Sequence, residues 1–260
     1  MTWFLQISER IRGYLNGDPD FSAKMHKSYI DFMKGNTTTF VDLLEECLGQ
    51  GHIRSLVSIN ESNAELVSRC LWIQTKQCVD QLHLIMDPTK AYRDGRNGFA
   101  DVFVGNSQRE VSALNSVVVI EFKSVSLLSL WKGKQQNPRA NPTSQYNYEA
   151  LVNELRQADE DQMLDMKHSV WDKNAGHWVT LKVNDIMQNA ITQVNNYLNV
   201  ISCGLGGQSS AGVQDDRVRC SHGGQDVLHG YVIMFVGGAR AICRPTMRKH
   251  TQWSYEVKVS

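Results

Sequence analysis

The chain has 260 residues, of which 42% are hydrophobic, so it can bury one sizeable core together with a small helical appendage. Its 27 basic and 27 acidic residues cancel, which excludes a protein that coats nucleic acid non-specifically. No apolar run approaches the roughly 18 residues of a membrane span, and the N-terminus lacks the charged start and apolar core of a secretory signal. We therefore expect one main domain in an intracellular protein, nuclear or cytoplasmic, that does not act in a membrane.

Two segments near the N-terminus, residues 21–33 and 37–48, have apolar residues at helical spacing. Asp20 and Thr37 are suitable residues to cap these helices. We interpret residues 1–55 as a helical N-terminal extension packed on the core. The main domain then covers residues 56–260.

A longer helix is predicted for residues 60–78, with Asn60 as its N-cap. Glu61 in its first turn has two interpretations, an acid stabilised by the helix dipole or a carboxylate directed at a functional site. Glu65 lies one turn later and is the neighbour that would replace Glu61 in the second role.

The first two core strands are predicted to follow this helix. Residues 81–86 alternate enough to form a strand, which Asp87 and Pro88 close as a turn. Residues 98–104 form a second short strand, and Asp101 lies within it.

The third predicted strand, residues 117–123, is an apolar run that ends in an acid and a base. Because side chains alternate along a strand, Glu121 and Lys123 share one face and Phe122 points to the other. If this strand pairs with the preceding one, Asp101 meets Glu121 at one end of the sheet. Two carboxylates repel one another unless a cation lies between them. A hard divalent cation, most simply Mg²⁺, meets that need, with Lys123 beside it to position or deprotonate a water molecule.

Residues 89–97 form a basic loop immediately before Asp101, with Lys90, Arg93 and Arg96. One interpretation is a solvated loop. The other is a loop whose cations contact substrate phosphates beside the site.

Residues 126–182 leave the core and are interpreted as a helical insertion facing solvent. A polar stretch, residues 135–145, precedes a helix-like segment, residues 146–164, and the acidic run 154–165 would repel a nucleic-acid backbone. The aromatic residues of the insertion are Trp131, Tyr146, Tyr148, Trp171 and Trp178. They either stack on bases or pack the insertion against the body of the protein, and we favour packing.

Residues 183–201 have the clearest amphipathic pattern in the chain. Gln193 borders the apolar stripe, and Tyr197 lies one turn further on the same side. From the pattern alone, this pair is an ordinary helix edge.

The C-terminal region begins with a loop rich in Gly, Ser and Gln, residues 204–224. Residues 230–236 and 239–243 are predicted as the last strands, joined by a tight turn at two glycines.

The six cysteines have no disulfide-framework spacing, which favours reduced thiols. Cys203, Cys220 and His222 suggest zinc, but no second tight ligand pair accompanies them, so we do not predict a zinc site.

Asp101, followed by Glu121 and Lys123 at the end of an apolar strand, resembles the motif of the PD-(D/E)XK nuclease superfamily. Residues 190–197, Ala-Ile-Thr-Gln-Val-Asn-Asn-Tyr, are similar to the Ala-x-x-Gln-x-x-x-Tyr helix that follows the Glu-x-Lys strand in one branch. That branch occurs in many fungal and protist proteins, often beside ATPase-like modules or in crinkler-type effectors.

Two further segments bear on this resemblance. Asn60 and Glu61 resemble the start of the family's N-terminal helix, whose Glu faces the metal site. Residues 98–101, Gly-Phe-Ala-Asp, stand where this branch usually has Gly-Arg-Ala-Asp. The departure at Phe99 is not at a metal ligand.

The resemblance implies an α/β, restriction-endonuclease-like core, with a mixed central sheet flanked by helices. It implies that Asp101, Glu121 and the carbonyl of Phe122 bind Mg²⁺, for which Mn²⁺ can substitute. Glu61 would bind a second cation or a metal-bound water.

Substrate-directed roles are also implied. Lys123 would orient the attacking water, and Gln193 would hold that water or a phosphate oxygen with support from Tyr197. Independently of the resemblance, Arg93 and Arg96 are the candidates for contacting the substrate backbone, because the basic loop lies immediately before Asp101.

The expected function is metal-dependent, endonucleolytic hydrolysis of nucleic acid, with DNA favoured over RNA. The alternative is a catalytically weak or inactive nuclease-fold effector or binding module that acts with a partner. A third interpretation is a regulatory module whose activity depends on an ATPase-like partner.

Overall fold

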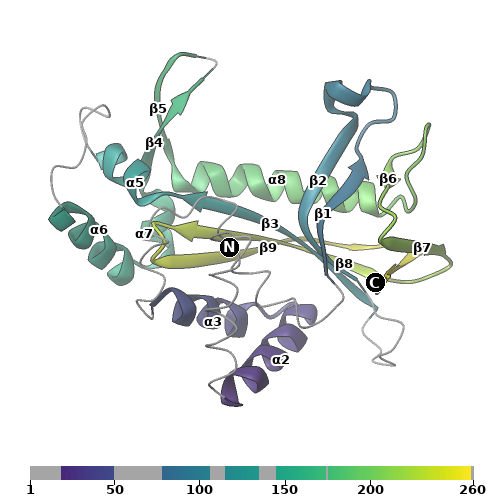
Figure 1. Cartoon of the computed structure of the whole chain (residues 1–260), viewed down its shortest axis with the longest axis horizontal. Coiled ribbons are helices and arrows are strands. Elements are labelled where there is room, and N and C mark those ends of the chain that lie inside the picture. Colours follow the sequence, from purple (N-terminus) through teal and green to yellow (C-terminus); the bar gives the residue numbers. More distant parts are fainter. Residues whose placement is uncertain (1–18, 50–77, 106–114, 135–144, 174, 259–260) are drawn as a thin grey trace, which may run out of the picture.

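The computed structural model describes residues 19–49, 78–105, 115–134, 145–173 and 175–258 (Figure 1). Helices α2 (Pro19–Met33) and α3 (Thr38–Gly49) confirm the two helices predicted near the N-terminus. The helix predicted for residues 60–78 lies outside the described residues, apart from Cys78, which begins a strand instead.

The centre of the fold is a six-stranded sheet with the order β6-β1-β2-β3-β8-β9. Its strands are β1 (Cys78–Ile85), β2 (Asn97–Val104), β3 (Ser116–Val125), β6 (Gly212–Val213), β8 (Val227–Val236) and β9 (Arg240–His250). Strands β1, β2 and β3 pair antiparallel, β3 and β8 pair parallel, and β8 and β9 pair antiparallel. The fold is therefore α/β with a mixed central sheet flanked by helices, as predicted.

Helix α8 (Val183–Ile201) has the bounds predicted from its amphipathic pattern, and it covers one face of the sheet (Figure 1). It belongs to the long connection that a parallel pair such as β3 and β8 requires. A Cβ atom added at Gly230 of β8 would lie 2.5 Å from Val194 and 2.9 Å from Leu198. The glycine therefore lets the helix pack closely on the sheet.

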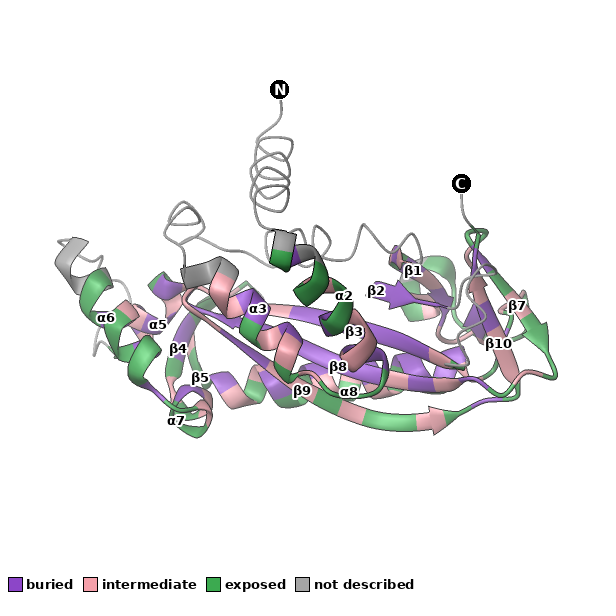
Figure 2. Ribbon diagram, turned by 90° about the horizontal axis from the view of Figure 1, so that it is seen from below, coloured by how far each residue is buried: buried purple, intermediate pink, exposed green. Residues whose placement is uncertain are grey.

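Strand β3 is buried on both faces, which explains its continuous apolar sequence. Val117 and Val119 belong to the core cluster that includes the apolar stripe of α8. Ile120 and Phe122 belong to a second cluster, with side chains of α2 and α3 such as Phe32. Figure 2 shows the buried strands between α8 and the two N-terminal helices.

The predicted insertion contains three helices and a hairpin: α5 (Leu127–Lys134), α6 (Gln145–Gln157), α7 (Glu160–Asp165), β4 (Lys167–Asp172) and β5 (His177–Lys182). The single helix predicted for residues 146–164 is wrong. The segment is divided before α7, where the carboxylate of Asp159 accepts a hydrogen bond from the backbone N–H of Gln162 at 2.8 Å. Leu155 and Met163 are buried in the core, so the insertion is not wholly a solvent-facing appendage.

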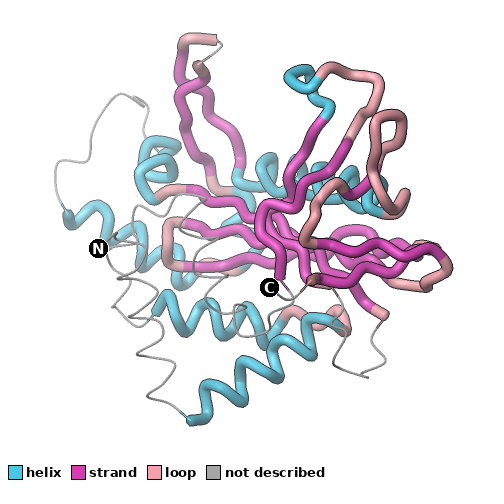
Figure 3. Tube along the Cα trace, turned by 45° about the vertical axis from the view of Figure 1, so that its right-hand side comes forward, coloured by secondary structure: helices cyan, strands magenta, loops and turns pink. Residues whose placement is uncertain are grey.

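Two hairpins project from the same side of the central sheet, with α8 between their bases (Figures 1 and 3). One consists of β1 and β2, joined through the helical turn η3 (Tyr92–Arg96). The other consists of β4 and β5, which form a separate two-stranded sheet.

The C-terminal strands are longer than predicted, since β9 continues to His250 and β10 (Trp253–Val257) pairs with β7 (Val218–His222). Among the described residues, no group of three or more His, Cys, Asp and Glu side chains is arranged to hold a metal, including Cys203, Cys220 and His222. No described helix is long and apolar enough to cross a lipid bilayer.

Candidate active site

The predicted site lies where β2 separates from β3. The pairing of these strands ends at Val102 and Ile120, and Asp101 is the next residue of β2 beyond that pair. Its Oδ2 atom accepts a hydrogen bond from the backbone N–H of Phe122 at 2.8 Å. The carboxylate therefore takes the place that a backbone carbonyl of β2 would occupy in a continuing ladder.

Glu121 and Lys123 lie on the face of β3 that α8 covers. Glu121 is only 2% exposed, although it is ionisable. The Nζ atom of Lys123 donates a hydrogen bond to Glu121 Oε1 at 2.6 Å, a short charge-assisted contact. A buried carboxylate is thus held against an amine that is itself only 20% exposed.

Helix α8 contributes the predicted pair Gln193 and Tyr197. Gln193 Nε2 donates to the Tyr197 hydroxyl at 2.6 Å. Burial raises the pKa of Tyr197, the hydrogen bond from Gln193 lowers it, and the nearby charges of Glu121 and Asp101 raise it further. Lys123 acts in the opposite direction. The charges of Asp101, Glu121 and Lys123 therefore act on Tyr197, whose hydroxyl is hydrogen-bonded to Gln193. The structure thus brings together five predicted site residues from β2, β3 and α8.

The remaining predicted residues are placed differently. Glu61 and the side chain of Arg93 lie outside the described residues. The guanidinium of Arg96 donates to the carbonyl oxygen of Gln208 at 3.1 Å and thereby links the basic loop to the glycine-rich loop. Phe99, which replaces the Arg usual in the resembling branch, is 46% exposed and stacks on His83 with ring centroids 5.1 Å apart.

The donor atoms at this site suit a hard cation. Asp101 and Glu121 offer carboxylate oxygens from adjacent strands. The N–H and C=O groups of a strand residue point to the same edge, so the carbonyl of Phe122 faces the side on which its N–H meets Asp101. Two carboxylates and one carbonyl match the way Mg²⁺ binds, since this ion keeps several of its waters. The residues present therefore fit Mg²⁺.

One residue at the site, Gln81, was not predicted from the sequence. Gln81 Nε2, on β1, donates to Asp101 Oδ1 at 3.3 Å. The sequence marks Gln81 only as a polar residue at the start of a predicted strand, with no signal for a contact to Asp101.

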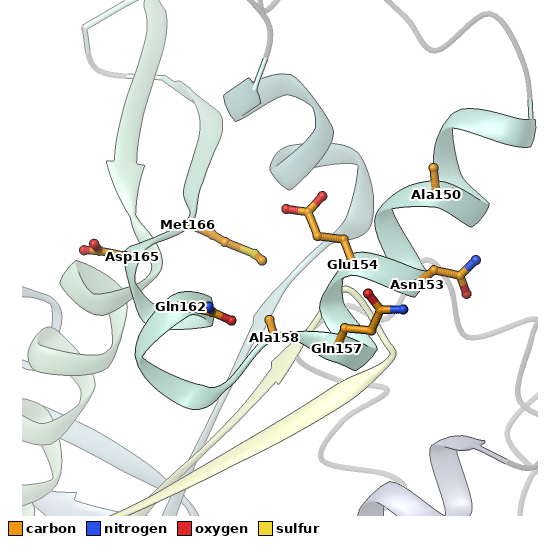
Figure 4. Close-up of a pocket in the computed structure, with 8 residues that line it drawn as sticks. All are labelled: Ala150, Asn153, Glu154, Gln157, Ala158, Gln162, Asp165 and Met166. Atoms are coloured by element: carbon orange, nitrogen blue, oxygen red, sulfur yellow. The ribbon is translucent and has the colours of Figure 1, made fainter.

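A hollow of about 830 Å³ lies elsewhere, between α6, α7 and the start of β4 (Figure 4). None of the residues that line it is a predicted site residue. Two of its carboxylates already have cationic partners, since Glu154 pairs with Lys134 and Asp165 accepts from Lys182 at 2.7 Å. This hollow offers no group of catalytic side chains comparable to that around Asp101.

Comparisons of the chain with family models, with curated proteins and with solved structures found no match.

Proposed function

We propose that this protein is a metal-dependent nuclease that hydrolyses phosphodiester bonds within nucleic acid chains, preferentially DNA. The observation that supports this most is that Asp101 accepts a hydrogen bond from the N–H of Phe122, the residue between Glu121 and Lys123, at the point where β2 leaves β3. The mixed sheet also supports a restriction-endonuclease-like core.

In this proposal, Asp101, Glu121 and the Phe122 carbonyl hold Mg²⁺. The ion, when bound, polarises the phosphate and lowers the pKa of a bound water. Lys123 then exchanges its contact with Glu121 for one with the attacking water, which it orients, and its charge offsets the negative charge that develops.

Gln193 and Tyr197 complete the proposed site from α8. The side-chain amide nitrogen of a glutamine carries two protons, so Gln193 can donate one to Tyr197 and the other to a phosphate oxygen or the attacking water. The hydroxyl of Tyr197 fixes the orientation of that amide, because their contact is short and Tyr197 is only 7% exposed.

The test is cleavage of supercoiled plasmid, linear duplex, single-stranded DNA and RNA with Mg²⁺ or Mn²⁺. We expect Asp101→Asn and Lys123→Ala each to lower the cleavage rate at least about 100-fold, as removal of a charge-stabilising group does. Asp161→Asn and Lys27→Ala, at exposed positions, are matched controls that should cleave normally. Absence of cleavage of every substrate by folded wild-type protein, with no metal binding by calorimetry, would contradict the proposal.

A second candidate is a binding module that keeps this fold without turnover and acts with a protein partner. The β4–β5 hairpin favours it, because Val170, Trp171 and Leu181 on this short element are 39%, 47% and 39% exposed. Val170 and Leu181 lie on one face of the hairpin and Trp171 on the other, so both faces of this projecting element present an exposed apolar side chain. A folded protein that neither binds metal nor cleaves nucleic acid would favour this candidate.

A further inference from the structure

Strand β1 has a kink at Gln81, directly opposite Asp101. Asp80 pairs with Val102 and Leu82 pairs with Ala100, so Gln81 and Asp101 lie between two regular pairs. Gln81 has a φ of 49°, and among the described residues it is the one non-glycine residue with a positive φ. Glycine is the usual residue in this left-handed region because a side chain there is strained.

The side chain of Gln81 has a use that glycine could not supply. Its amide donates to Asp101 Oδ1 at 3.3 Å, while the N–H of Phe122 donates to Oδ2 at 2.8 Å. Both oxygens of Asp101 are thus held, one from each neighbouring strand. Strained conformations persist where the surrounding structure fixes them, and they cluster at functional sites.

Arg217 fixes the kink from outside the sheet. Its guanidinium donates to the backbone carbonyls of Asp80 at 2.8 Å and of Gln81 at 3.4 Å. It also donates to the carboxylate of Asp80 at 2.8 Å. One planar group therefore holds the two consecutive carbonyls at the kink, which a lysine could not do with the same geometry.

Asp215 orients this guanidinium. Its carboxylate accepts from Arg217 Nε at 2.9 Å and from the NH2 nitrogen of Arg217 at 2.8 Å. It also accepts from the backbone N–H of His83 at 3.3 Å, which ties it to β1 itself. The hydrogen bonds from Arg217 hold the pKa of Asp215 at about 2, so this carboxylate is ionised at neutral pH.

We propose that Gln81 and Arg217 are positioning residues for Asp101. Gln81 holds the carboxylate in the orientation in which it accepts from the N–H of Phe122, and Arg217 holds Gln81 in the strained conformation that directs its amide at Asp101. The effect on turnover rests on the proposed nuclease function, whereas the effect on the Asp101 carboxylate does not.

The decisive measurement is hydrogen exchange of the Phe122 amide by NMR, because this N–H donates to Asp101. We expect Gln81→Gly and Arg217→Ala each to accelerate this exchange about tenfold, since the acceptor is then less well fixed. Gln252→Gly and Arg219→Ala, both at exposed positions, are the matched controls that should leave the exchange rate unchanged.

Thermal melting separates positioning from general destabilisation. Gln81→Gly relieves the strained backbone, so its melting temperature should equal or exceed that of Gln81→Ala, although both variants lose the amide. In the nuclease assay, both should lower kcat about tenfold with little change in KM, as misplacement of a metal-binding carboxylate does.

If the exchange rate of the Phe122 amide is unchanged in both Gln81→Gly and Arg217→Ala, this inference is overturned, whatever the cleavage assays show. If the exchange rate of the Phe122 amide changes in these variants but the wild-type protein cleaves no substrate, the positioning of Asp101 is supported and the nuclease proposal is contradicted. The two failures are therefore distinguishable.

Discussion

The β1–β2 and β4–β5 hairpins are both projecting antiparallel pairs, but the rest of the protein holds them in different ways. The β1–β2 hairpin is joined to β3 and β6 in the central sheet, and Arg217 fixes its outer strand. The β4–β5 hairpin is a sheet of its own, and Trp171 near its tip is 47% exposed. The hairpin that contains Asp101 is the one whose backbone is held by neighbouring strands and by Arg217. The hairpin that presents apolar side chains is attached mainly at its base.

The β4–β5 hairpin depends on contacts between its own strands. Ser169 and Thr180 hydrogen-bond at 2.7 Å, and the rings of Trp171 and Trp178 meet edge to face with centroids 5.8 Å apart. The amine of Lys132 on α5 lies 4.1 Å from the Trp178 ring centroid. Cross-strand pairs contribute only about 0.2–1 kcal/mol each, so the base of this hairpin must stabilise it further.

The largest effect is expected at the site beside the β1–β2 hairpin. Lys123→Met removes the amine from Glu121, whose side chain is only 3% exposed, and this should lower the free energy of unfolding by about 3 kcal/mol. Mg²⁺ should restore more stability to this variant than to wild type, because the cation then replaces the amine. Urea denaturation with and without Mg²⁺ measures both effects.

Lys27→Met, at an exposed position, is the control for this experiment and should change the stability little. A loss below about 1 kcal/mol for Lys123→Met would show that the pair with Glu121 behaves as a surface ion pair.

A smaller effect is expected at the base of the β4–β5 hairpin. An added Cβ at Gly133 on α5 would lie 2.1 Å from the carbonyl oxygen of Lys167, so Gly133→Ala must push β4 away from α5. Overpacking of this kind costs about 2 kcal/mol. Hydrogen exchange should accelerate in β4 and β5 and leave the Phe122 amide unchanged.

Gly207→Ala is the matched control, because its added Cβ would meet only the Ser210 hydroxyl oxygen at 3.1 Å. If Gly133→Ala accelerates hydrogen exchange equally in both hairpins, the inference that the two hairpins are held differently is wrong.

Acid should loosen the β1–β2 hairpin through Asp215. The pKa of Asp215 in the folded protein is about 2, below its ordinary value of 3.8, so the stability it contributes is present above about pH 4 and is lost as the pH falls toward 2. Amide shifts of Gln81 and Leu82 should titrate in this range. Asp215→Asn should abolish that titration, and its persistence in this variant would assign it to another carboxyl group.

The smallest effect is expected at Trp171. Because half of this side chain is exposed, Trp171→Ala should change the free energy of unfolding by less than about 1 kcal/mol. Trp178→Ala should cost more, since that ring is half-buried beneath Lys132. Equal losses in thermal or urea unfolding would mean that Trp171 is as integral to the hairpin as Trp178.

Elements with strong periodicity were predictable from the sequence. Helix α8 and the buried strand β3 have apolar patterns long enough to define them, and the pairing of β2 with β3 brings Asp101 to the N–H of Phe122. The break before α7 also has a local signature, because Asp159 and Gln162 form a capping box.

Other features have no local signature. The β4–β5 hairpin mixes charged, hydroxyl and aromatic side chains and has exposed positions on both strands, so its alternation does not mark one buried face. The contact between Arg217 and Gln81 joins residues 136 positions apart. Such a contact follows from the course of the chain in space and not from any sequence pattern.

The close approach of α8 to Gly230 has a mechanical consequence. Helix α8 starts directly after β5, and Gln193 lies about 15 Å further along it, at 1.5 Å per residue. Val194 and Leu198 rest on Gly230, and buried side chains continue along the helix from Val183 to Ile201, so α8 is fixed on the sheet over its whole length. One continuous helix thus joins the end of the β4–β5 hairpin to the turn that carries Gln193 and Tyr197, so the packing of α8 on β8 sets where these two side chains stand.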